Sequence, residues 1–376
     1  MAVRSRVGRP GTGRHASDAE ARRRSLPWNT RVSTAVSPSP PAARIALWDN
    51  ARLLLIVLVV FGHGIETLRE DPAVRAVYVV VYSFHIPALL LIGGWFARAA
   101  PLERRSLVGT ARLLATWLVA EAGWALSRAL MHKDVLPDTF LVIPGWTLWF
   151  LVTLAAMRIA LPYLAMLRYP LLASVVISLA AGLSPSVGLE FSASRTLALL
   201  PFFVLGWRLR QARLEDRAWF RSPSPGVRIG AALVAGAVVL GLLAATRTSW
   251  FTNQLLFWRR SYDGEHLDDP VGAALRLLFL AIGAVLTVAL LVLVPREQRW
   301  YSVLGRNTLP VYLLHAPLLS AMRRAHLDDA IAARPGAMAV MLGLAVLATL
   351  VLGSPPVARV LRPVLEPSLP FSPARS

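Results

Sequence analysis

Charged and imidazole side chains interrupt one apolar stretch near the start of the chain, WDNARLLLIVLVVFGH at residues 48–63. Asp49 and Arg52 lie at its beginning, and His63 lies at its end. At 100° per residue of an α-helix, Arg52 and His63 fall within roughly 20° of the same face, and Asp49 lies about 40° from His63. A helix here would carry a charged pair and, roughly 16 Å further along, an imidazole on one stripe. Polar groups are costly inside a membrane-spanning helix, so each is a functional candidate.

His63 is the candidate general base, because imidazole is the side chain that accepts and releases protons near neutral pH. A buried, hydrogen-bonded structural histidine explains the residue equally well at this level. Whether His63 is a base or a structural histidine depends on the helices that position it.

Composition indicates a helical membrane protein. Of the 376 residues, 56% are hydrophobic and only 16% are charged, whereas soluble domains carry about 25% charged residues. Apolar runs of about twenty residues recur along the chain, which is the length that crosses a bilayer as a helix. The fold class predicted is therefore an all-α polytopic membrane protein.

The basic charge fits a membrane better than a nucleic acid. The formal net charge is +19, and Lys133 is the only lysine. The arginines gather in short loops between apolar runs, as the positive-inside rule and contact with anionic membrane lipids require. We therefore expect no nucleic-acid partner, and an arginine- and alanine-rich, lysine-poor composition suggests a GC-rich bacterial genome. The absence of cysteine excludes disulfides, thiolate metal sites and an acyl-cysteine intermediate.

The hydropathy pattern predicts about ten transmembrane helices. They are expected at about 45–65, 74–97, 107–131, 145–164, 170–187, 194–210, 227–246, 271–294, 302–322 and 337–361. Pro185 and Pro201 interrupt the fifth and sixth. Residues 1–44, rich in arginine, proline and serine, predict a disordered basic cytoplasmic tail with no cleaved signal peptide. Residues 45–362 form the predicted transmembrane domain, and 363–376 form a short cytoplasmic tail.

Loop charges predict the orientation. Arginines dominate the loops at 98–106, 211–226 and 295–301, whereas most acidic residues fall in the alternate loops. This asymmetry favours an even number of spans with both termini cytoplasmic, although Arg259-Arg260 and Arg323-Arg324 run against it. Asp49 and Arg52 would then lie at the cytoplasmic end of the first helix, with His63 toward the outer end.

Four segments together resemble the bacterial membrane-bound acyltransferase 3 family, the O-acetylases of envelope sugars, and most closely its fucose- and trehalose-type branch. They are DNAR at 49–52 running to VVFGH at 59–63, SFHIP at 83–87 running to IGGWF at 92–96, LWFL at 148–151, and LGRNTL at 304–309 running to VYLLH at 311–315. The resemblance extends from about residue 45 to 361. One departure is Gly93, which stands where the family commonly has serine.

The resemblance implies acyl transfer from acetyl-CoA, approaching from the cytoplasm, to a sugar or glycolipid acceptor at the bacterial inner membrane. Such chemistry needs a base for the hydroxyl proton and a place for an anionic donor. His63 is the expected base. Guanidinium groups of Arg52 and Arg98 suit the donor's phosphates, although side chains reaching to the membrane interface would look the same. Asp49 either orients Arg52 or forms a purely structural ion pair.

The remaining candidates have weaker signals. His85 lies mid-span, two residues before a helix-loosening proline, and either lines the lumen as a second catalytic histidine or is a core histidine. Asn307 binds the donor or caps a helix. Trp149 and His315 are candidates for orienting substrate, with packing as the alternative for both. No metal site is expected, because the acidic loop at 263–269 reads as a solvated loop.

Two other functions remain open on the sequence. A helical bundle with histidine and arginine in its lumen could instead transport an anionic metabolite or a lipid-linked sugar. An inactive family member acting as a scaffold is the third reading, with Gly93 as its only support. For the enzyme, direct transfer to the acceptor and a transient acyl-histidine relay are both compatible with these residues.

Overall fold

The computed structural model describes residues 46–100, 104–132, 139–248 and 253–365, which contain helices and turns and no strand. The predicted basic tail at 1–44 lies outside these residues. The main helices are α1 (Leu47–Gly64), α2 (Pro72–Trp95), α3 (Arg104–His132), α4 (Trp149–Ala165), α5 (Pro170–Ala180), α6 (Ala193–Gln211), α8 (Pro225–Ala245), α9 (Asp269–Leu293), α11 (Thr308–Arg324) and α13 (Ala337–Leu352). Shorter helices are α7 (Ala218–Arg221), α10 (Ser302–Arg306), α12 (Leu327–Ala332) and α14 (Pro355–Leu365).

Each of the ten predicted segments contains a helix, but several boundaries were wrong. The fourth begins at Trp149 rather than at 145, and the fifth ends at Ala180, before Pro185. The ninth is two helices, α10 and α11, and the tenth is α13 and α14, which meet at a bend of 72°. Helix α14 runs to Leu365, three residues beyond the predicted end of the transmembrane domain.

Four described helical segments are long and apolar enough to cross a membrane. They are Leu47–Leu68, Pro72–Trp95, Pro225–Ala245 and Asp269–Leu293, and the bent pair α13–α14 makes a fifth if it counts as one span. Helix α8 has a mean hydropathy of 2.2 over an 18-residue stretch, of which only 6% is buried. A helix that exposes so much apolar surface is expected to contact lipid. The ten crossings and the cytoplasmic termini stay predictions.

Helices α2 and α6 pack backbone to backbone. A Cβ on Gly94 would lie 1.8 Å from the Phe203 carbonyl oxygen, and one on Gly206 would lie 1.9 Å from that of Leu91. Small residues that let two backbones approach are the usual contact between helices in membranes. A Cβ on the neighbouring Gly93 would lie 2.9 Å from the Leu154 side chain, so a serine there would crowd α4.

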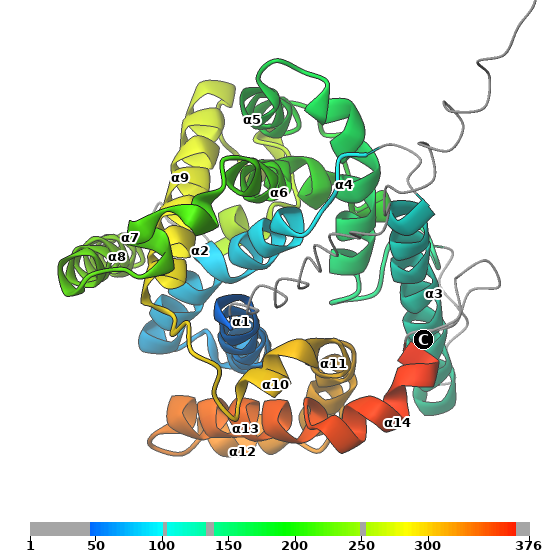
Figure 1. Ribbon diagram of the computed structural model, residues 1–376. Helices are drawn as coiled ribbons and strands as arrows, with labels where there is room; N and C mark the ends of the chain where they lie inside the picture. Colours follow the sequence, from blue (N-terminus) through cyan, green and yellow to red (C-terminus); the bar gives the residue numbers. More distant parts are fainter. Residues whose placement is uncertain (1–45, 101–103, 133–138, 249–252, 366–376) are drawn as a thin grey trace, which may run out of the picture. The chain divides into compact units, whose positions relative to one another are not determined.

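Helix α1 contacts α2, α10, α11 and α13 (Figure 1). Its first turn is fixed by Asn50, whose amide donates to the carbonyls of Pro295 (2.8 Å) and Glu297 (3.1 Å). The same side chain accepts a 2.7 Å hydrogen bond from Ser302. Gly305 packs directly on this turn, since a Cβ there would meet the Asp49 carbonyl oxygen at 1.7 Å. The start of α1 and the 295–305 segment are therefore held as one unit.

Candidate functional site

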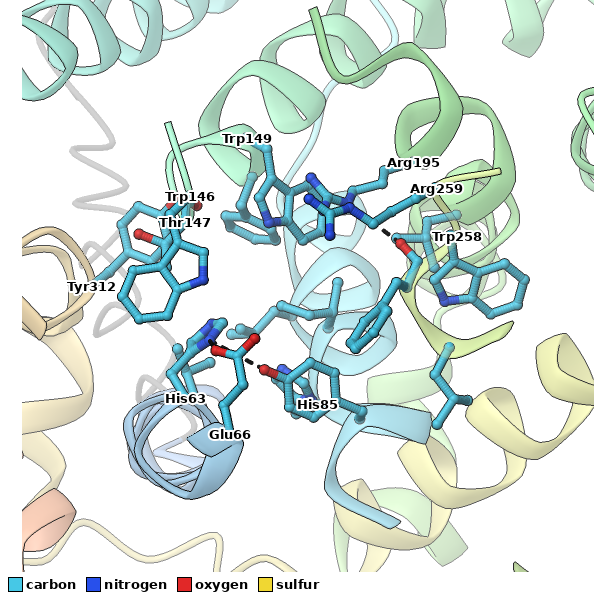
Figure 2. Close-up of a pocket in the computed structure, with 18 residues that line it drawn as sticks. His63, Glu66, His85, Trp146, Thr147, Trp149, Arg195, Trp258, Arg259 and Tyr312 are labelled. Atoms are coloured by element: carbon cyan, nitrogen blue, oxygen red, sulfur yellow. Dashed lines mark hydrogen bonds and ion pairs between the residues drawn. The ribbon is translucent and has the colours of Figure 1, made fainter. Parts of the chain in front are cut away.

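A cavity of about 90 Å³ lies among α1, α2, α4, α6 and α11 (Figure 2). Its polar and aromatic lining is His63, Glu66, Tyr82, His85, Trp146, Thr147, Trp149, Arg195, Trp258, Arg259 and Tyr312. Three of the predicted site residues, His63, His85 and Trp149, are thereby brought together. They come from three different helices, so only the tertiary fold places them side by side.

The His63 ring is oriented by two neighbours. Its Nδ1 lies 3.1 Å from the Tyr82 hydroxyl and 3.8 Å from a carboxylate oxygen of Glu66. Glu66 follows His63 by three residues, immediately after α1 ends in a 3₁₀ turn at Ile65–Leu68. A carboxylate beside Nδ1 favours the tautomer with its proton on that nitrogen, which leaves Nε2 to accept a proton. This is the arrangement of a base held by an orienting acid.

Arg323 joins α11 to this group. Its guanidinium donates to the His63 carbonyl at 2.8 Å and lies 3.5 Å from Glu66. It also lies over the Trp146 ring, 4.7 Å from the ring centre. Trp146 in turn meets the His63 ring edge to face at 5.2 Å. His63 therefore contacts both an ion pair and an indole.

Trp146 is positioned by a buried carboxylate on α3. Glu121 is 4% exposed and accepts hydrogen bonds from the Gly145 amide (3.0 Å) and from the Trp117 indole (3.1 Å). This contact holds residues 145–148 in turns, which is why the predicted helical start at 145 was wrong. A buried charge needs such partners to be tolerated.

The other two histidines have different surroundings. His85 is 1% exposed, donates from Nδ1 to the Val81 carbonyl at 2.7 Å, and lines the cavity. His315 is fully buried behind His63, with its ring 5.4 Å away and its Nδ1 2.6 Å from the Tyr312 carbonyl. It does not line the cavity, and its Nε2 has no hydrogen-bond partner within the described part of the chain. His315 therefore contacts the His63 ring and does not face the cavity.

The remaining predicted residues lie at the other end of α1. Asp49, 4% exposed, is 3.6 Å from Arg52 and 3.9 Å from Arg306. Arg52 also lies over the Phe96 ring at 4.6 Å, next to the α2 end that leads to the exposed Arg98. This group does not line the His63 cavity.

Asn307 occupies the N-cap position of α11, but its side chain does not cap that helix. It donates instead to the Gly353 carbonyl, at 3.2 Å. The capping interpretation of this residue was therefore wrong. The bond ties the α10–α11 junction to the end of α13.

Sequence reasoning missed Glu66, Tyr82, Trp146, Arg195 and Arg259 as site residues, along with Arg323. Two of them had a local signal, since Glu66 lies three residues after His63 and Tyr82 three before His85, spacings that share a helix face. Trp146, Arg195 and Arg259 reach the cavity from a turn, from α6 and from a loop, and Arg323 contacts His63 from α11. No spacing in the sequence brings those to His63.

The matched family covers both groups of residues. A family model described as an acyltransferase domain, that of the acyltransferase 3 family, matches residues 45–353. No curated protein and no solved structure matches the chain. The match spans the Asp49–Arg52 end of α1, the His63 cavity and α11.

Proposed function

The chain belongs to the acyltransferase 3 family, and on that premise we propose that it is an integral membrane O-acyltransferase. It would move an acetyl or other acyl group from acyl-CoA to a hydroxyl of an envelope sugar or glycolipid, in a bacterial inner membrane. The proposal includes the O-acetylase branch of the family. What supports it most is His63, held by Tyr82 and Glu66 at the edge of a cavity.

The proposed step is a direct acyl transfer. The acceptor hydroxyl attacks the thioester carbonyl, and its proton passes to Nε2 of His63. The carbon–sulfur bond then breaks, and the thiolate of CoA leaves and takes up the proton. Glu66 stabilises the imidazolium formed between these two events, because the carboxylate lies beside Nδ1.

The donor end is proposed at the start of α1. Arg52 and Arg306 flank Asp49 there, and Arg98 is exposed nearby. Guanidinium groups bind phosphate oxygens through paired hydrogen bonds. Asp49 would hold the two arginines in place until the phosphates of the donor arrive.

Replacing His63 tests the proposal. In purified protein we expect His63→Ala to lower acceptor-dependent release of CoA by about 10²- to 10⁴-fold, which is the usual contribution of a positioned base. Elution as a single folded species in detergent would show that the fold survives. His266→Asn is the matched control, because it removes an exposed imidazole outside the cavity at a left-handed position that asparagine tolerates.

Two results would contradict this assignment. Retained turnover in His63→Ala would remove His63 as the base. Movement of a substrate across vesicles by the wild-type protein without thioester cleavage would favour transport instead.

A further inference from the structure

The His63 cavity holds more positive than negative charge. Glu66 is the only acidic residue among its lining residues, and it is already within 4 Å of Arg69 and Arg323. Arg195 and Arg259 also line the cavity, and neither has a carboxylate within ion-pair distance in the described residues. Two guanidinium groups facing one small space repel each other unless an anion lies between them.

Arg195 is held in place with most of its donors unused. Its Nε donates to the Phe257 carbonyl at 3.4 Å, and its guanidinium lies over the Trp149 ring at 4.4 Å. A guanidinium carries five N–H donors. Within the described part of the chain, the four donors on the two terminal nitrogens of Arg195 have no protein acceptor. Stacking on an indole fixes the plane of these donors before any ligand arrives.

Arg259 is carried by a firmly anchored loop. The neighbouring Trp258 is 7% exposed and adopts a left-handed backbone conformation, with φ at 55°. Tyr262 of the same loop donates from its hydroxyl to the Leu179 carbonyl at 2.8 Å, and Arg276 of α9 lies over the Tyr262 ring, 4.8 Å from the ring centre. A bulky residue persists at positive φ only where its surroundings enforce it, and such positions cluster at functional sites. In Figure 2 the Arg195 and Arg259 side chains both run toward Trp149.

We propose that Arg195 and Arg259 bind an anionic oxygen group, phosphate or carboxylate, on the acyl acceptor. The acceptor would then be an acidic sugar or an acidic glycolipid headgroup rather than a neutral sugar. This inference rests on the proposed function, because it assigns the cavity to the acceptor. The acceptor is favoured over the donor because the pair shares its cavity with His63, whereas the arginines proposed for the donor lie at the far end of α1.

Calorimetry on the purified full chain in detergent, at constant ionic strength, tests the anion site without turnover. The probes are inorganic phosphate, glucuronate and, as the neutral match, glucose. We expect Arg259→Gln to bind both anions at least about tenfold more weakly than wild type, since hydrogen bonds to charged groups are the strong ones. Arg260→Gln, which removes the same charge one residue away and outside this cavity, should bind them as wild type does.

Arg195 is tested through its conservative variant. Arg195→Lys keeps the charge but loses the planar fork and its stacking on Trp149, so we expect weaker anion binding with unchanged elution from a sizing column. Equal anion affinity in wild type, Arg195→Lys and Arg259→Gln would overturn the proposal, as would absence of anion binding to the wild type.

A second comparison tests whether the bound anion belongs to the acceptor or to the donor. If Arg259→Gln raises the KM for acetyl-CoA but not for acetylpantetheine, which lacks the phosphates, the anion belongs to the donor and the acceptor assignment is wrong. Failure of the proposed function would appear separately, as absence of thioester cleavage in a wild-type protein whose anion affinity still depends on Arg259.

Discussion

His63 is held by side chains from three segments: Glu66 after α1, Tyr82 on α2 and Arg323 on α11. Glu66 carries the charge that an imidazolium needs beside it, and Arg323 holds Glu66 in place. Tyr82 offers a neutral hydrogen bond to the same nitrogen. The pair Glu66 and Arg323 therefore places a charged group beside the ring, whereas Tyr82 orients its Nδ1.

Removing only the charge of Glu66 tests this division. We expect Glu66→Gln to lower kcat by about tenfold or more with little change in KM, because the imidazolium forms only during the reaction. Glu70→Gln, an exposed acid four residues later, serves as the control and should leave both constants unchanged. A Glu66→Gln variant with a raised KM and an unchanged kcat would show that Glu66 binds substrate instead.

At the scale of elements, the site depends on the close contact of α2 with α6. These two helices carry Tyr82, His85 and Arg195. Gly94 and Gly206 allow the contact by letting each backbone touch the other.

Adding one methyl group at this contact should disrupt the fold. Gly94→Ala places a Cβ against backbone that cannot move aside, so we expect a loss of thermal stability equivalent to about 1–3 kcal/mol or more. Gly236→Ala on α8 is the control, since nothing lies within 4 Å of a Cβ there and alanine favours a helix over glycine. Equal melting temperatures for Gly94→Ala and wild type would contradict the close contact.

The apolar pattern predicted where helices lie, but it did not predict where a helix is interrupted. The bend between α13 and α14 falls at Ser354, just before Pro355 and Pro356. A residue before proline avoids the helical region, but the apolar pattern on both sides hid this signal. At the break, the Asn307 side chain bonds to Gly353, a contact that exists only in the folded chain.

For the molecule as a whole, the sequence placed Asp49, Arg52 and His63 on one helix and missed what surrounds them. Asp49, Arg52 and His63 share α1, so their spacing was readable as a local pattern. Trp146 lies on a turn held by Glu121, and Arg259 lies on a loop held by Tyr262. Such contacts join residues far apart in the chain, and helical periodicity carries no information about them.

The orientation in the membrane can be measured directly because the chain has no cysteine. Asp268→Cys and Arg217→Cys each introduce one thiol at an exposed position, on either side of α8. We expect an impermeant maleimide to label Asp268→Cys in intact spheroplasts and Arg217→Cys only after lysis, as the loop charges predict. The reverse pattern would place His63 toward the cytoplasm and the Asp49 end outside.

Helix α1 runs without a break from Leu47 to Gly64, so the distance between Arg52 and His63 is fixed by helix geometry at about three turns. Under the proposed function, a donor anchored by its charge at Arg52 reaches the base only if its acyl group lies that far from the charge. A compact donor whose anion adjoins the acyl carbon cannot occupy both ends at once. The helix would thus select donors by their length, before any contact with the acyl group itself.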